Sequence, residues 1–159
     1  MSIVDEVNSA NASYAAGFTK GDLAMPPARH FAVVTCMDAR LDPAKFLGLE
    51  EGDAHVIRNA GGLVNDETLR SLIISHHLLG TQEAIVIGHT DCGMVTFQNS
   101  DLYSKLGPES ESIDFQPFPD AAARVRESVA TIESSSLLPD SFTATGFVYE
   151  VESGKIVPV

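Results

Sequence analysis

Three short apolar runs, separated by segments of helical spacing, constrain the fold of this chain most strongly. The runs are FAVVTC at 31–36, AHVIRNAGG at 54–62 and EAIVIGH at 83–89. Each is short, rich in β-branched residues and followed by a polar or glycine turn, which is typical of buried strands. DPAKFLGLEEGD at 42–53 and NDETLRSLIISHHLLG at 65–80 lie between them and predict helices. Strands that alternate with helices indicate an α/β domain with a mainly parallel central sheet flanked by helices.

The two ends of the chain depart from this alternation. Residues 142–159 predict a strand, a Ser-Gly turn and a closing strand, which would add an antiparallel C-terminal edge strand after a helix at 119–135. Residues 98–118 are polar and carry Gly and Pro, which indicates a surface excursion with one short helix. Residues 1–28 have weak helical spacing before a Pro-Pro break and predict an N-terminal helical arm. We expect residues 29–159 to form a single α/β domain.

Charge and composition exclude several classes of partner. The chain of 159 residues has 22 acidic and 10 basic residues and a net charge of −12, so its surface should repel nucleic acid and anionic membranes. No run of eighteen apolar residues exists. The N-terminal segment has neither a basic start nor an apolar core, unlike a signal peptide. A cytoplasmic protein is expected. Its two cysteines do not indicate a disulfide scaffold; inert thiols, a redox pair and metal ligands remain open.

Both cysteines and one histidine stand at predicted strand ends. Cys36 closes the first strand, His89 closes the third, and Cys92 follows three residues later. Right-handed crossovers favour the first and third strands as neighbours, with the second outside the first, so these side chains would meet at the switch point of the sheet. Two thiolates and one imidazole suit zinc, and three protein ligands leave the open position of a catalytic site. Zinc lowers the pKa of a bound water to roughly 7.

Asp38 and Arg40 flank Ala39 and therefore point to the same side of an extended turn. Asp38 could accept a hydrogen bond from zinc-bound hydroxide while Arg40 keeps it ionised and in place. Alternatively, Asp38 could swing to the metal as a fourth ligand, or the two residues could be a solvated surface pair. Asp91 lies between His89 and Cys92, where a supporting role and a solvated loop carboxylate are both open.

These residues make the chain recognisable as similar to a known family. In order and spacing, three motifs resemble those of the β-class carbonic anhydrases across about residues 31–96. They are CMDARL at 36–41, VIRNAGG at 56–62 and GHTDCGM at 88–94. The closing GFVYEVESGKI resembles the last strands of that family. The resemblance implies a zinc enzyme that reversibly hydrates carbon dioxide to bicarbonate and a proton.

The resemblance also implies which residues form the site. It implies one zinc ion per chain on Cys36, His89 and Cys92, so that residues 29–159 would be a single α/β zinc-binding catalytic domain. It further implies an Asp38–Arg40 dyad, in which Asp38 can also bind zinc in a closed state, and a backbone N–H at Gly93 that faces the substrate oxygen. Finally, it implies a homodimer or higher homo-oligomer with the arm wrapped over a partner.

Two other functions remain open on the sequence. A family relative with similar motifs hydrolyses carbon disulfide, so the same zinc site could act on carbon disulfide or carbonyl sulfide. A zinc-binding module without turnover is the third reading, although a structural site needs no Asp38–Arg40 dyad.

The chain departs from the family pattern at two positions. It has Ala39 where many family members have serine, and Gly62 where many have asparagine.

Overall fold

A five-stranded sheet in the order β2-β1-β3-β4-β5 forms the centre of the protein. The structure is a computed structural model that describes residues 1–159. Its strands are β1 (Phe31–Cys36), β2 (Ala54–Asn59), β3 (Glu83–His89), β4 (Thr143–Tyr149) and β5 (Ile156–Pro158). The first four are parallel and β5 pairs antiparallel with β4. The predicted α/β class, the neighbouring first and third strands and the antiparallel edge strand are confirmed.

Five α-helices connect or flank these strands, and two short 3₁₀ turns accompany them. The helices are α1 (Ile3–Ala16), α2 (Pro43–Leu47), α3 (Asp66–Leu79), α4 (Asn99–Leu106) and α5 (Ala121–Glu133); the 3₁₀ turns are η1 (Gly93–Val95) and η2 (Pro108–Ser112). Residues 98–118 thus contain η2 in addition to the single helix expected there. Gly107, with a φ of 93°, ends α4, and the fixed φ of Pro108 suits the first position of a new turn.

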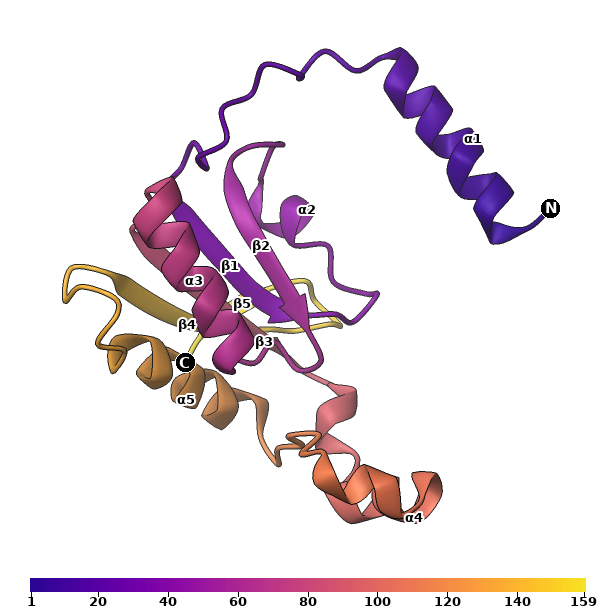
Figure 1. The fold of residues 1–159 in the computed structure, drawn as a ribbon, viewed down its shortest axis with the longest axis vertical. Coiled ribbons are helices and arrows are strands. Elements are labelled where there is room, and N and C mark those ends of the chain that lie inside the picture. Colours follow the sequence, from indigo (N-terminus) through magenta and orange to yellow (C-terminus); the bar gives the residue numbers. More distant parts are fainter.

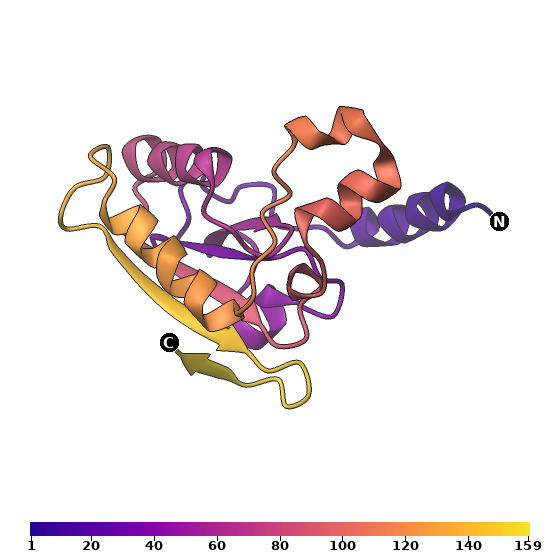
Figure 2. The same cartoon turned by 90° about the horizontal axis from the view of Figure 1, so that it is seen from below.

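The two faces of the sheet are covered unequally. On one face α3 and α5 pack against alternate residues of β1 and β3, as Figure 1 shows for α3 and Figure 2 for α5 running along β4. Leu72 of α3 and Ile132 of α5 are fully buried in that core. The other face is built on Phe31, Val33 and Ile87 and is covered by Phe46 and Leu47 of the five-residue helix α2. Helix α1 extends away from the sheet and buries none of its residues (Figures 1 and 2).

The carboxyl ends of β1 and β3 lie side by side, because the two strands pair in parallel from Phe31–Glu83 to Thr35–Ile87. All six residues of β1 are buried, so the strand has one fixed position in the sheet. The chain goes to β2 on one side and returns to β3 on the other, which makes this edge the switch point of the fold. No helix of the structure combines the length and the apolar character needed to cross a membrane.

Candidate metal centre

Cys36, His89 and Cys92 meet at the switch point. Their candidate ligand atoms all lie within 4.8 Å of one another, and all three residues are buried. Cys36 is the last residue of β1, His89 is the last residue of β3, and Cys92 follows in the turn that leads to η1. The parallel pairing of the two strands therefore brings together the three residues that the sequence singled out.

The imidazole of His89 has one nitrogen committed and one free. Its Nδ1 atom donates to the carbonyl oxygen of Thr90 at 2.8 Å. The Nε2 atom is buried and has no hydrogen-bond partner in the protein. A buried nitrogen without a partner is costly, and metal ligation is a recognised way to satisfy it. Two buried sulfur atoms and this nitrogen form a donor set that fits zinc.

The two thiols influence each other strongly. Contact with the Cys92 thiol, followed by contact with His89, lowers the pKa of Cys36 well below that of an ordinary thiol. The same contact with Cys36 raises the pKa of Cys92, because a second negative charge beside the first is unfavourable. A first thiolate here therefore disfavours a second, and a divalent cation would make both thiolates favourable.

Asp38 lies beside this cluster and is fixed by Arg40. The Nε and one terminal nitrogen of Arg40 donate to the two carboxylate oxygens of Asp38 at 3.0 and 2.8 Å. The backbone N–H of Arg40 donates to the same carboxylate at 2.9 Å. These bonds hold the pKa of Asp38 well below its usual range. The side chains thus point the same way, as predicted, and they form an ion pair with two-point geometry rather than two separate solvated groups.

Arg58 supports the turn that carries Cys36 and Asp38. From β2, its Nε atom donates to the carbonyl oxygen of Cys36 at 2.9 Å and a terminal nitrogen donates to that of Asp38 at 2.7 Å. The neighbouring Asn59 side chain exchanges hydrogen bonds with the backbone N–H and carbonyl of Leu63. From the sequence, Arg58 and Asn59 were only a polar pair at the end of a strand. The contacts of Arg58 with β1 depend on the register of the two strands, which the sequence does not give.

Gly93, the predicted substrate-contacting residue, begins η1 directly after Cys92. Apart from its neighbours in the chain, nothing lies within 4 Å of the place where a Cβ atom would stand, so this side of Gly93 faces open space. A cavity of about 490 Å³ is lined in part by His89 and Cys92, whereas Gly93 does not line it. Its lining is mainly apolar and includes valines of β4 and β5. Small uncharged molecules are the ligands that such a lining favours.

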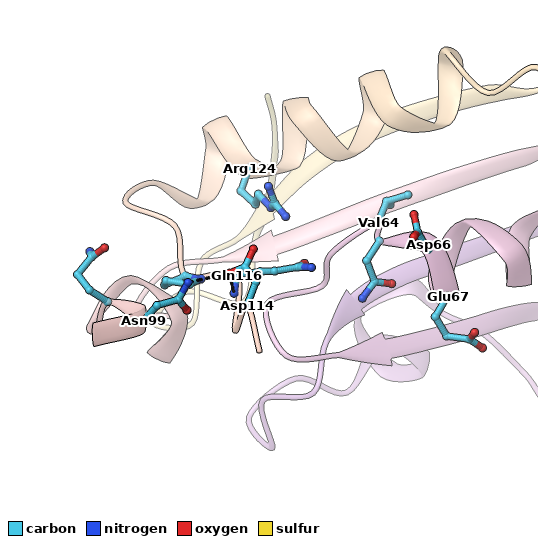
Figure 3. A pocket seen from close by; sticks show the side chains of 10 residues that line it. Val64, Asp66, Glu67, Asn99, Asp114, Gln116 and Arg124 are labelled. Carbon is cyan, nitrogen blue, oxygen red and sulfur yellow. Dashed lines mark hydrogen bonds between the residues drawn. The ribbon is translucent and has the colours of Figure 1, made fainter. Parts of the chain in front are cut away.

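A second cavity, of about 790 Å³, lies outside the cysteine–histidine cluster and is almost entirely polar. Figure 3 shows Arg124 of α5 facing Asp114 and Gln116 across it, with the first turn of α3 on the far side. Its lining contains three carboxylates, those of Asp66, Glu67 and Asp114, and a single arginine. This excess of negative charge disfavours an anion such as bicarbonate. None of the predicted site residues lines this cavity.

The chain belongs to the β class of the carbonic anhydrase family, which is a family of lyases. Residues 31–156 match the carbonic anhydrase family, and these residues include the whole cysteine–histidine cluster. Beta-carbonic anhydrase 1 of Mycobacterium tuberculosis is 45% identical over 159 residues, which cover 98% of this chain and 97% of the relative. The resemblance inferred from the three sequence motifs is therefore confirmed.

Solved structures agree on the fold, and one group of relatives bears another name. The carbonic anhydrase of Streptococcus mutans superimposes with a TM-score of 0.93 at 42% identity, covering 100% of this chain and 98% of that one. A carbon disulfide hydrolase of Saccharolobus solfataricus is 31% identical over 180 residues, covering 96% of this chain and 87% of the relative. Family membership thus leaves open which small carbon compound is the substrate.

Proposed function

We propose that this protein is a zinc-dependent carbonic anhydrase that reversibly hydrates carbon dioxide to bicarbonate and a proton. One zinc ion per chain would be held by Cys36, His89 and Cys92. The bare, buried Nε2 atom of His89 between two buried thiols is the observation that carries this assignment. The higher identity to a β-carbonic anhydrase than to a carbon disulfide hydrolase, 45% against 31%, favours carbon dioxide.

The residues of the chain divide the work between metal binding and substrate handling. Zinc, when bound, acidifies a coordinated water so that a nucleophile is available near neutral pH. His89 presents Nε2 because its Nδ1–H is held by Thr90. Asp38 stays ionised beside Arg40 and accepts a hydrogen bond from the attacking group, which orients the lone pair. The backbone N–H of Gly93 donates to the substrate oxygen.

The proposed assembly is a homodimer or higher homo-oligomer in which α1 packs on a partner chain. Helix α1 exposes Ile3, Val4 and Val7 at 71%, 62% and 58% of their surfaces. A helix of 14 residues is marginal in water on its own. Packing against a second chain would bury this apolar stripe and stabilise the helix.

Stopped-flow measurement of carbon dioxide hydration, on protein of measured zinc content, tests the proposed activity. The expected result is hydration proportional to bound zinc, together with slower or absent release of hydrogen sulfide from carbon disulfide. Hydrogen sulfide release that exceeds hydration would favour the second candidate, a carbon disulfide or carbonyl sulfide hydrolase. Zinc-loaded protein with neither activity would identify a binding module without turnover.

A further inference from the structure

Asp91 contacts Arg40 on the side opposite Asp38. One terminal nitrogen of Arg40 donates to the Asp91 carboxylate at 2.6 Å, and the other donates to the Asp91 carbonyl oxygen at 2.9 Å. The same guanidinium donates to both carboxylate oxygens of Asp38. Arg40 therefore stands between two carboxylates, one beside the cysteine–histidine cluster and one in the loop between His89 and Cys92. Planar bidentate contacts of this kind fix the orientation of an arginine.

The loop presents Asp91 in a fixed conformation. Asp91 has a φ of 54°, in the left-handed region that aspartate and asparagine tolerate better than most residues. Thr90, the preceding residue, is held from two sides. Its N–H donates to the Tyr149 carbonyl at 2.9 Å and its hydroxyl accepts from the Val151 N–H at 3.0 Å. The Asp91 carboxylate is thus placed by its backbone rather than by burial, since the side chain is 75% exposed.

Packing alone does not hold the guanidinium of Arg40. Its side chain is 47% exposed and borders an open cavity of about 640 Å³. The acidic residues Glu150 and Glu152 also line that cavity. Both offer alternative carboxylates toward which an unrestrained Arg40 would turn. The two bonds to Asp91 therefore add to the bonds with Asp38 itself in keeping the guanidinium aimed at that carboxylate.

We propose that Asp91 is a positioning residue, which acts through Arg40 to keep Asp38 away from the metal ligands. This inference rests on the proposed zinc site. The Oδ2 atom of Asp38 lies 3.9 Å from Nε2 of His89, so a small rotation would let the carboxylate join the ligand set. Arg40 opposes that rotation, and Asp91 keeps Arg40 in the orientation that opposes it. Loss of the Asp91 charge would raise the population in which Asp38 occupies the open ligand position.

Anion binding to the cobalt-substituted protein measures this population without using turnover. Azide added to the protein competes with Asp38 for the open position, and the visible absorption of cobalt reports its binding. A larger closed population weakens the apparent azide affinity in proportion. Asp91→Asn removes the charge but tolerates the same backbone conformation. For an exposed ion pair, we expect a loss of about two- to fivefold in azide affinity.

A double-mutant cycle distinguishes action through Arg40 from a direct effect on the loop. Arg40→Ala should weaken azide binding at least as much as Asp91→Asn. In the Arg40→Ala background, Asp91→Asn should have no further effect. Asp140→Asn, an exposed aspartate before β4, is the matched control and should leave azide affinity unchanged.

Three results would overturn the proposal. The first is unchanged azide affinity in Asp91→Asn, and the second is an equal loss of azide affinity when Asp91→Asn is made in wild type and in Arg40→Ala. The third is protein that takes up no cobalt, which would also remove the proposed metal site. A cobalt protein with the expected coupling whose zinc form hydrates no carbon dioxide would contradict the proposed activity alone. Circular dichroism of each variant confirms that differences in affinity arise in folded protein.

Discussion

The Nε2 atom of His89 and the Oδ2 atom of Asp38 lie 3.9 Å apart at the carboxyl edge of the sheet. This distance is too long for a hydrogen bond and short enough for both atoms to reach one metal ion. The nitrogen has no partner, whereas the carboxylate is held by Arg40. The Asp38 carboxylate therefore lies beside the cluster while it is engaged with Arg40, which is the arrangement that the proposed open site requires.

Replacing any one of the three proposed ligands with alanine should remove most of the zinc. Cys36→Ala, His89→Ala and Cys92→Ala each leave two protein donors, too few for a stable site. We expect zinc to fall from about one per chain to below about a tenth after gel filtration with a mild chelator. His77→Ala, at an exposed histidine of α3, should retain its zinc. Full occupancy in all three ligand variants would contradict the assignment.

Removal of Arg58 should destabilise the protein and loosen the metal site. Arg58→Ala leaves the carbonyl oxygens of Cys36 and Asp38 without two charge-assisted hydrogen bonds. We expect the free energy of unfolding in urea to fall by about 2 kcal/mol. Zinc should also dissociate faster, because the turn that carries Cys36 is less constrained. Arg126→Ala, at an exposed position of α5, should change stability by less than about 0.5 kcal/mol. Equal stability of the two variants would argue against this role.

Gly146 allows α5 to approach β4 closely. A Cβ atom at this position would stand 2.6 Å from Cγ1 of Val125, which is closer than two carbon atoms can pack. Gly146→Ala should therefore lower the free energy of unfolding by about 1–3 kcal/mol. Combination with Val125→Ala should cost less than the sum of the two single changes, because the second removes the clash. Gly17→Ala, whose nearest contact would be 3.9 Å, is the control. Simple additivity would show that the helix moves aside instead.

The sequence predicted the sheet and its cysteine–histidine cluster because both depend on strand order. Apolar runs of strand length specify β1 and β3, and the handedness of crossover connections makes them neighbours. Their carboxyl ends must then meet, which places Cys36 beside His89. Such contacts follow from topology and need no knowledge of side-chain conformation.

The contacts of Arg40 and Arg58 could not be predicted in the same way. Arg40 reaches Asp91, 51 residues further along the chain, through a loop whose left-handed residue turns the carboxylate toward the guanidinium. Arg58 reaches two carbonyl groups on another strand, which requires the register of β1 against β2. The sequence therefore left Asp91 open between a supporting role and a solvated one. Long side chains that cross between elements are decided by local turn geometry, which spacing alone does not determine.

Acidification should loosen the attachment of the arm. Glu51 accepts hydrogen bonds from Lys20 and Tyr14, and these bonds lower the pKa of its carboxyl group. Because the pKa of Glu51 is lower in the folded state, its contacts with Lys20 and Tyr14 are fully present above the ordinary glutamate pKa. They are lost as the pH falls through the lower, folded-state pKa. Amide protection at 14–20, corrected for the intrinsic effect of pH on exchange, should therefore fall when the pH is lowered from 6 to about 3.

The same measurement on Glu51→Gln separates this contact from general acid unfolding. The variant should show weak protection at 14–20 at both pH values. Glu152→Gln, a change distant from the arm, should behave like wild type. Protection in Glu51→Gln that equals wild type at pH 6 would mean that other contacts hold the arm.

The arm should be required for assembly. Ile3 and Val7 share one face of α1 by their spacing, and both side chains are exposed within the chain. Val7→Asp places a charge on that face and should shift the protein toward monomer in sedimentation experiments at micromolar concentration. Ser9→Asp adds the same charge on the opposite face of α1 and should leave the dimer intact.

Deletion of residues 1–18 should produce the same shift toward monomer as Val7→Asp. It should also lower the thermal unfolding temperature, because the partner surface loses its cover. A wild-type monomer at micromolar concentration would contradict the proposed assembly. Equal dimerisation of Val7→Asp and wild type would show instead that copies associate through another surface, such as the free edge of β5.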